Sequence, residues 1–431
     1  MRIVELSSES RDRLLEDLLK RSPNSYGEFE GRVAAILADV KERRDAALFE
    51  YTKKFDGADI SADNLVVTEE EIREAYETVD PSLVEIIRKA LVNIRAYHEK
   101  QRRYSWFDSK PNGSMLGQKI TPLRRVGVYV PGGKAVYPSS VLMNIVPAKV
   151  AGVEEIVMTT PPGKDGKVNP TTLVAAKEAG ADVIYKVGGA QAIAALAYGT
   201  ESIPKVDKIV GPGNIYVALA KKAVYGHVSI DSIAGPSEIL VLADDGCNPA
   251  WVAADLLSQA EHDKLASPVL VTDSPALARA VQAELEVQIP QLPRAAIARA
   301  SVDDNGKIIV CTDLHKAIEV CNIIAPEHLE VCVEDPFGVL NEIKNAGSIF
   351  LGRNVPEALG DYFAGPNHTL PTSGTARFSS PLGVDDFVKK SSFLYYTREA
   401  LGEVAPRIAD FAEREGLHAH AKSVTIRYEE D

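Results

Sequence analysis

Two short segments of this chain bring together side chains that can bind a metal ion or move a proton. In the first, Gln259 and His262 close an apolar, helix-like run, and their spacing of three residues places them on one helix face. An amide oxygen and an imidazole nitrogen on one face can both bind a divalent cation. In the second, Glu327 and His328 lead into a strand-like run, and a carboxylate beside an imidazole suits proton transfer near neutral pH.

These residues also have ordinary structural explanations. A histidine at the end of a helix, as at His262, can serve only to stabilise the helix C-terminus through the helix dipole. Glu327 and His328 can form a solvated entry to a strand. The chain contains only 8 histidines, however, so the placement of two of them beside Gln259 and Glu327 makes both segments candidate sites.

Bulk composition excludes several classes of protein. A chain of 431 residues with 45% hydrophobic and 25% charged residues has the composition of a globular protein of two or more domains. The net charge of −13 argues against nucleic acid as a partner, because phosphate binding requires clustered lysine and arginine. No apolar run approaches the roughly 20 residues of a membrane span, and the N-terminus lacks the apolar stretch of a signal peptide. We therefore expect a cytoplasmic enzyme that binds neither membranes nor nucleic acid.

Cysteine spacing gives little support to a thiol-based site. No C-x-x-C pair is present, and two of the cysteines fall inside apolar, strand-like runs. We expect buried, reduced thiols at all four positions, with Cys247, in a polar turn, as the least unfavourable candidate for a reactive one. The four are Cys247, Cys311, Cys321 and Cys332.

The order of helix-like and strand-like segments predicts an α/β fold: two Rossmann-like (incomplete) parallel-sheet domains with a helical N-terminal arm and a C-terminal helical tail. The arm has helix-start signals in the capping box at Thr68 and in Asp80-Pro81. From about residue 126, strand-like and helix-like runs alternate, which is typical of a parallel sheet covered by helices. The expected parts are a helical arm at 1–105 packing on the larger domain, an α/β domain at 106–125 plus 237–380 carrying the metal and acid-base residues, a second α/β domain at 126–236 with the cofactor turns, and the tail at 381–431.

Four glycine-rich turns follow strand-like runs, at 131–133, 187–191, 211–214 and 234–237. Backbone amides in such turns can approach a ligand closely, and a helix that begins there attracts anions. For any single turn, the steric need for glycine is a sufficient explanation. Four together favour a ligand crevice, although no G-x-G-x-x-G fingerprint is present to identify the ligand as a dinucleotide.

Over nearly its whole length, roughly residues 30–428, the chain resembles the histidinol dehydrogenase family. The resemblance implies a zinc-dependent homodimer that oxidises L-histidinol to L-histidine through an aldehyde, with two hydride transfers to NAD⁺. It also implies that the tail reaches the active site of the partner subunit, so that the two active sites are shared. The matching segments are 126–133, 187–200, 206–214, 235–238, 255–262, 326–329, 347–352, 360–371 and 414–420.

The same resemblance implies roles for individual residues. Glu327 and His328 would be the catalytic acid-base pair. The zinc ligands would be Gln259, His262, Asp361 and His420. The substrate-binding residues would be Ser237, Gln259, His262, Glu327, His328, Asp361, Glu415 and His420. The NAD contacts would be Tyr129, Gln191 and Asn214.

Some of these positions keep a simpler alternative. Asp361 after Gly360 fits an Asx-turn, and Tyr129 fits ordinary packing inside a strand. His418 lies two residues from His420, but choosing it would require a slip against the family pattern. His368 resembles a family position near the site and is given a lesser role, while His98, His227 and His315 are expected to be structural or at the surface.

The implied chemistry agrees with the residue types. Two imidazoles, a carboxylate and an amide oxygen form a ligand set that suits Zn²⁺. The metal would act mainly as a template that orients the substrate, with His328 as base for the hydroxyl proton and Glu327 activating water at the aldehyde step. Two other functions stay open. One is a related zinc- and NAD-dependent dehydrogenase of another small polyol, against which Glu415 and His420 argue. The other is a non-catalytic metal- or nucleotide-binding protein, against which the joint presence of Glu327 and His328 argues.

Overall fold

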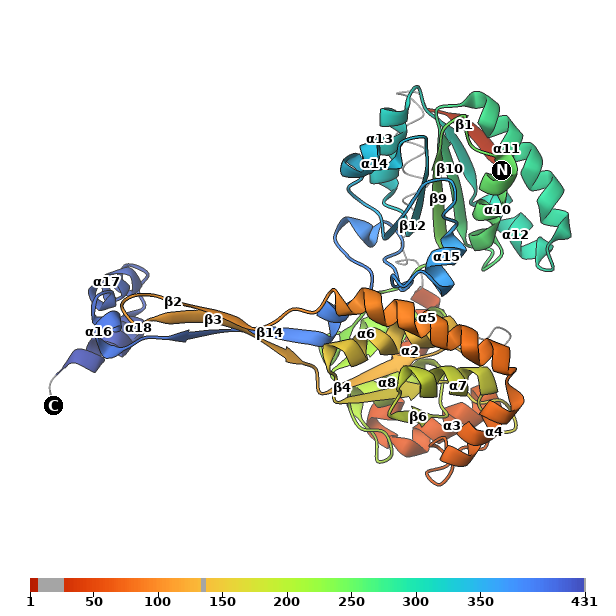
Figure 1. The fold of residues 1–431 in the computed structure, drawn as a ribbon. Helices are drawn as coiled ribbons and strands as arrows, with labels where there is room; N and C mark the ends of the chain where they lie inside the picture. The colour runs from red at the N-terminus through yellow and green to blue at the C-terminus, as the bar shows by residue number, and fades with distance from the viewer. Residues whose placement is uncertain (7–26, 133–136, 430–431) are drawn as a thin grey trace. The chain divides into compact units, whose positions relative to one another are not determined.

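The computed structural model describes residues 1–6, 27–132 and 137–429 of the chain. Two compact units are present (Figure 1): Met1–Gln101 with Leu123–Phe387, and Arg102–Pro122 with Val388–Asp431. The part of the expected helical arm at 7–26 lies outside the described residues, as does the last residue of the turn at 131–133. Among the residues that are described, no helix combines the length and the apolar character needed to cross a membrane.

The first sheet of the larger unit is parallel throughout, in the order β6-β5-β4-β7-β8. Its strands and helices alternate along the chain as the hydrophobic pattern predicted. The strands are β4 (Arg125–Tyr129), β5 (Glu155–Thr159), β6 (Val183–Tyr185), β7 (Lys208–Val210) and β8 (Ser229–Ile230). The helices between them are α6 (Pro138–Ala151), α7 (Pro170–Ala179), α8 (Gly189–Tyr198) and α9 (Ile215–Val224).

Each face of this sheet has its own apolar core. Val126 and Val128 of β4 belong to a cluster with α5, α6 and α7, whereas Tyr129 belongs to a second cluster with α2, α3, α8 and α9. Both faces are buried because neighbouring side chains on a strand point to opposite sides. The helices contributed by the N-terminal arm are α2 (Gly27–Arg43), α3 (Asp45–Asp56), α4 (Glu69–Thr78) and α5 (Pro81–Glu99).

The second sheet of this unit is also parallel, in the order β1-β11-β10-β9-β12-β13. Its strands are β1 (Arg2–Glu5), β9 (Glu238–Ala243), β10 (Ser267–Thr272), β11 (Lys307–Val310), β12 (His328–Cys332) and β13 (Ser348–Leu351). The helices around it are α10 (Pro249–Ala260), α11 (Pro275–Gln288), α12 (Ala295–Asp304), α13 (Leu314–Ile324), α14 (Pro336–Val339) and α15 (Glu357–Tyr362), with short 3-10 turns at Ile289–Gln291, Leu340–Glu342 and Thr375–Arg377. A further 3-10 turn, Val384–Phe387, packs in the α6 core of the first sheet.

The first residues of the chain differ from the expected helical arm. Arg2–Glu5 form strand β1, which pairs in parallel with β11 and completes one edge of the second sheet. Ile3 and Val4 pack against the two opposite apolar cores of this sheet, as neighbouring strand residues should. A run of four strand residues has too little periodicity to be recognised without its partner, so the sequence pattern missed it.

The smaller unit holds an antiparallel sheet that the sequence pattern did not predict. Residues 106–125 were expected in the α/β domain with the metal residues, but β2 (Trp106–Ser109) and β3 (Met115–Pro122) pair with β14 (Val388–Tyr395). The tail at 381–431 therefore begins with an extended strand before its helices. Those helices are α16 (Arg398–Gly402), α17 (Ala405–Arg414) and α18 (His418–Thr425), with a 3-10 turn at Ile426–Tyr428.

The helix-start signals are confirmed. Thr68 forms a complete capping box with Glu71 at the start of α4. The Asp or Asn before a proline also caps the helix that follows: Asp80, Asn169 and Asn248 accept hydrogen bonds from backbone N–H groups of α5, α7 and α10, respectively. Ser274 likewise caps α11.

Candidate active site

A strained turn delivers Glu327 and His328 to the second sheet. Ala325 ends α13 with a φ of 51°, in the left-handed region that residues with a side chain rarely adopt. Ala325 is fully buried, and its N–H donates to the carbonyl oxygen of Cys321 at 2.9 Å. Such a conformation persists only where the surrounding packing fixes it, and it is common at functional sites. The turn places His328 as the first residue of β12, between β9 and β13.

The tautomer of His328 is fixed by the neighbouring strand. Its Nδ1 lies 2.9 Å from the carbonyl oxygen of Glu238, the first residue of β9, and since a carbonyl only accepts, Nδ1 carries the proton. Its Nε2 is buried with no hydrogen-bond partner among residues 1–6, 27–132 and 137–429, and lies 3.7 Å from Glu357 Oε1 and 3.9 Å from Asp361 Oδ1. Burial lowers the pKa of His328, so the neutral ring is favoured and Nε2 is free to accept a proton.

The carboxyl group of Glu327 lies beside the same ring. Its Oε2 accepts a hydrogen bond from the Glu238 N–H at 2.8 Å and is 3.7 Å from Nδ1 of His328. Burial raises the pKa of Glu327 well above its usual value. A carboxyl group with a raised pKa, held beside an imidazole, is suited to proton transfer. The two residues expected to form the acid-base pair are therefore buried side by side.

Asp361 forms a close pair with a residue that the sequence analysis missed, Glu357. Both lie on α15, and their spacing of four residues puts them on one helix face. Burial and the adjacent charge of Glu357 raise the pKa of Asp361 to about 9. Burial also opposes ionisation of Glu357, but His328 and hydrogen bonds from Asp361, Gln259 and Ser258 lower its pKa below the usual value. The two carboxyl groups therefore share a proton, and His328, Glu357 and Asp361 each offer a metal-ligating atom within 4.8 Å of the others.

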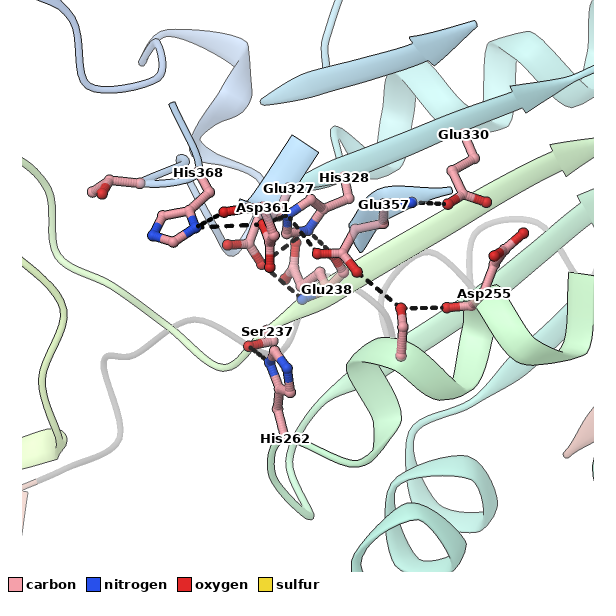
Figure 2. A network of polar contacts seen from close by, with 12 residues as sticks. Ser237, Glu238, Asp255, His262, Glu327, His328, Glu330, Glu357, Asp361 and His368 are labelled. Atoms are coloured by element: carbon pink, nitrogen blue, oxygen red, sulfur yellow. Dashed lines mark hydrogen bonds and ion pairs between the residues drawn. The ribbon is translucent and has the colours of Figure 1, made fainter. Parts of the chain in front are cut away.

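Gln259 and His262 lie at the C-terminal end of α10. Gln259 is buried, with its side chain hydrogen-bonded to Glu357, and so joins the group around His328. His262 is exposed, and its Nδ1 lies 3.5 Å from the hydroxyl oxygen of Ser237. Figure 2 shows Ser237 and His262 as a pair next to the carboxyl groups around His328.

Further acidic residues extend this network behind His328. The Ser258 hydroxyl lies within hydrogen-bonding distance of Glu357 at 3.0 Å and of the Asp255 carbonyl oxygen at 2.7 Å (Figure 2). Glu330, fully buried on β12, accepts a hydrogen bond from the Glu357 N–H, and burial raises its pKa to about 9. These contacts hold the start of α15 against the middle of the sheet.

His368 also lies against Asp361. Its Nδ1 donates to the Asp361 carbonyl oxygen at 3.1 Å, and its Nε2 is 3.3 Å from the Ser140 hydroxyl at the start of α6. Burial lowers the pKa of His368 to about 4, so the ring is neutral. The Ser140 contact brings the amino end of α6, from the first sheet, to the group around His328.

The three candidate cofactor residues lie at the carboxyl edge of the first sheet. Tyr129 ends β4, and its buried hydroxyl oxygen accepts a hydrogen bond from the Gly189 N–H at 3.1 Å. Gln191, in the first turn of α8, is buried with its Oε1 unpartnered. Asn214 is exposed and caps α9 through its side-chain oxygen, which leaves its amide NH₂ available. This edge is where parallel sheets commonly bind nucleotides.

The turn before Asn214 is clamped by a buried ion pair. Lys221 of α9 and Asp231 after β8 form the pair, with both side chains almost inaccessible to solvent. Lys221 donates to the Gly211 carbonyl oxygen at 2.9 Å, and Asp231 accepts from the Gly211 N–H at 2.8 Å. Gly211 has a φ of 114°, and a Cβ there would collide with the carbonyl oxygen of Tyr129, so this position requires glycine.

Comparison with known proteins assigns the family. The sequence profile of the histidinol dehydrogenase family matches residues 19–428. The chain is 59% identical over 410 residues to a histidinol dehydrogenase from Bacillus subtilis, covering 95% of this chain and 96% of that one. The chain belongs to the histidinol dehydrogenase family. A second relative, from Clostridium acetobutylicum, is 55% identical over 428 residues and covers 99% of each chain. The crystal structure of the histidinol dehydrogenase from Elizabethkingia anophelis superimposes with a TM-score of 0.94 at 38% identity, covering 99% of this chain and 98% of that one.

Histidinol dehydrogenases are oxidoreductases of histidine biosynthesis, and the α/β fold expected from the sequence agrees with this membership. Two expected site residues, Glu415 and His420, lie in the smaller unit. Glu415 follows the last residue of α17, His420 is on α18, and both are exposed. The cysteines are confirmed as free and buried, and burial raises the pKa of Cys247, which makes it a poor nucleophile.

The usual rule for α/β proteins would not have found this site. The rule places ligands at the carboxyl ends of parallel strands. In this histidinol dehydrogenase family member, His328 and Glu238 instead begin β12 and β9, and His262 precedes β10. Glu357 carried one usable signal, its helical spacing to Asp361, but that signal is visible only if α15 is recognised as a helix.

Proposed function

We propose that this protein is a zinc-dependent histidinol dehydrogenase that oxidises L-histidinol to L-histidine through the aldehyde, with two NAD⁺ reduced per product. The observation that carries the proposal is the environment of His328. Its Nδ1 is committed to the Glu238 carbonyl oxygen, and its unpartnered Nε2 faces a group of carboxyls. A family member with this arrangement has a base of defined tautomer in the position where an alcohol proton must be removed.

The residues around His328 fit a divalent cation. Glu357 and Asp361 share a proton because two carboxylates this close repel one another. In the described part of the chain, no lysine or arginine forms an ion pair with Glu327, Glu357 or Asp361. A metal ion would replace the shared proton and balance the negative charge. Buried carboxyl groups that lack a basic partner are therefore an argument for a cation at this position.

We infer that zinc is held by Gln259, His262 and Asp361, with His420 supplied by a second copy of the chain. The nitrogen and oxygen donors of this set suit Zn²⁺. When bound, the metal would supply a template that orients the substrate. The exposure of His420, which has no ligand role within its own unit, is compatible with its use by a partner. The protein would then be a homodimer with shared active sites.

The chain's own residues divide the proton transfers. In the alcohol step, His328 accepts the hydroxyl proton at Nε2 while hydride leaves the same carbon for NAD⁺. In the aldehyde step, Glu327 accepts a proton from water as the water adds to the carbonyl carbon. His328, after releasing its first proton to solvent, accepts the hydroxyl proton of the hydrate as the second hydride leaves. Ser237 and Glu415 would bind the polar groups of the substrate, and Tyr129, Gln191 and Asn214 would contact NAD.

An assay with purified protein tests this proposal. We expect NADH to form with L-histidinol in a ratio of two per histidine, to stop when a chelator removes the metal, and to resume when zinc is added. Turnover of a different small polyol, without turnover of histidinol, would instead assign the protein to another dehydrogenase activity on the same fold. Binding of metal and NAD without turnover of any substrate would show that the protein is a non-catalytic binding protein.

A further inference from the structure

A second set of unpartnered polar atoms lies away from His328. It is on the face of the first sheet that α2, α3, α8 and α9 cover. Asp56 is the last residue of α3, and its Oδ2 is buried with no hydrogen-bond partner among the described residues. Thr159 ends β5, and its buried hydroxyl likewise has no partner in the described part of the chain. Gln191, at the start of α8, has an Oε1 that none of the described residues partners. Buried polar atoms are normally hydrogen-bonded, so three such atoms near one edge of a sheet require an explanation.

Several contacts place these atoms in one region. Tyr129 and Thr159 are directly paired between β4 and β5, so their side chains point to the same face. That face is packed by α2, α3, α8 and α9, because Tyr129 belongs to the same apolar core as residues of those helices. Tyr129 also accepts the hydrogen bond from Gly189, two residues before Gln191.

The end of α3 reaches the same edge. Gly57, which follows Asp56, lies against the side chain of Lys164 in the loop after β5. Pro161 of that loop lies against Gly132 after β4 and Gly188 before α8. The negative charge of Asp56 is near enough to Tyr129 to contribute to the raised pKa of that phenol. Asp56 therefore borders the glycine turns at the carboxyl edge of the sheet.

Asp56 is costly for the fold, which points to a role in binding. Burial alone raises the pKa of its carboxyl group to about 6, and no basic residue in the described part of the chain forms an ion pair with it. A partly buried carboxylate without a partner destabilises the protein that carries it. Groups that are unfavourable for stability are common at binding and catalytic sites.

A ribose is the ligand chemistry that fits these atoms. A carboxylate at the carboxyl edge of a parallel sheet can accept hydrogen bonds from the hydroxyls of a ribose, and it repels a phosphate attached there. The reacting end of the dinucleotide must reach the group around His328. The contact between Ser140 and His368 joins the α6 side of the sheet to that group. Asp56 lies on the opposite face from α6, so it would meet the adenosine half.

We propose that Asp56 accepts hydrogen bonds from the adenosine ribose hydroxyls of the dinucleotide and thereby selects NAD⁺ over NADP⁺. This inference rests on the proposed function only for the identity of the cofactor. It assigns cofactor selection to the N-terminal helical segment rather than to the sheet and its turns. The carboxylate would bind the free 2′-hydroxyl of NAD⁺ and repel the 2′-phosphate of NADP⁺.

The test compares Asp56→Asn with a matched control, Asp59→Asn. Asp59 lies three residues further on, with an exposed side chain that pairs with Lys53 at 2.5 Å, so its substitution removes the same charge away from the unpartnered atoms. The ratio of kcat/KM for NAD⁺ to that for NADP⁺ is measured with L-histidinol for both variants and wild type. We expect Asp56→Asn to lower this ratio at least about tenfold, mainly through a higher KM for NAD⁺, and the control to leave it unchanged.

A binding measurement separates this inference from the proposed function. The rise in Tm on adding NAD⁺ or NADP⁺ requires no turnover, so it reports cofactor selection even if histidinol is not the substrate. Asp56→Asn should fold at least as stably as wild type without ligand, because it removes an unpaired buried charge, and should lose part of the NAD⁺-induced rise. An unchanged NAD⁺/NADP⁺ preference in Asp56→Asn, by either measurement, would mean that Asp56 does not contact the ribose and would overturn the proposal. A wild-type protein whose Tm responds to neither cofactor would overturn it as well.

Discussion

The charge of Glu357 should be required for the base strength of His328. Glu357→Gln keeps the size and most hydrogen bonds of the side chain but removes its negative charge, 3.7 Å from Nε2. For unit charges at this distance and an effective dielectric constant of about 20, the attraction is at most about 4.5 kcal/mol. Hydrogen bonds from Ser258 and Gln259 partly compensate for the missing charge. We therefore expect protonated His328 to lose about 1.5–3 kcal/mol of stabilisation, which lowers kcat roughly 10- to 150-fold.

The pH dependence gives the sign of this effect. The Glu357 charge raises the pKa of His328 against the lowering caused by burial, so its removal lowers that pKa further. His328 must be neutral to accept a proton, and activity therefore rises as the pH rises through its pKa. In Glu357→Gln the acid limb of the kcat profile should move to lower pH while the plateau falls.

Stopped-flow measurement of NADH formation across pH, with zinc content determined on the same samples, provides the assay. Glu319→Gln is the control, since this carboxylate is half exposed and pairs with Lys316 on the surface of α13. A Glu357→Gln enzyme with full zinc, a kcat within twofold of wild type and an unmoved acid limb would refute the reasoning. A loss explained wholly by missing zinc would make Glu357 a support of the metal site rather than of the base.

Three further substitutions test other parts of the site. Glu327→Gln should impair the aldehyde step at least tenfold more than the alcohol step, because only the aldehyde step needs an activated water. Single-turnover assays that start from the alcohol and from the aldehyde should show this difference. Equal losses in the two steps would contradict the division of roles. His262→Asn should lower the affinity for zinc roughly 10- to 100-fold, and an unchanged zinc content would remove His262 from the ligand set. Lys221→Met should destabilise the fold by about 3–5 kcal/mol in urea unfolding, because Asp231 is left buried and unpaired; a double substitution with Asp231→Asn should recover part of that loss, and no recovery would show that the pair is not coupled.

Local sequence signals predicted most of the larger unit. Proline after Asp80, Asn169 and Asn248 marked helix starts, because the side chain before proline caps the helix. The alternation of apolar strands with helices predicted two parallel sheets. The pairings of strands β1, β2, β3 and β14 were not predicted. Either the partner strand lies more than 200 residues away in the sequence, or the strands are exposed and have no buried face.

The candidate site was predicted in part. The types and spacing of Gln259, His262, Glu327 and His328 identified two segments, and the resemblance to the family connected them. Glu357 and Asp56 were missed because their significance comes from burial and from the lack of a partner, which only three-dimensional packing reveals. Burial of a charge cannot be inferred from the residue type when its neighbours come from distant parts of the chain.

The ion pair of Lys221 with Asp231 affects the exchange of dinucleotides in the proposed reaction. Two dinucleotides must enter and leave for each histidine made, while the aldehyde stays bound. Since the peptide groups on both sides of Gly211 are held from inside the protein, the loop ahead of Asn214 has its final shape before any cofactor arrives. Exchange of one dinucleotide for the next then requires no refolding of that loop, which lowers the entropic cost of binding the second oxidant.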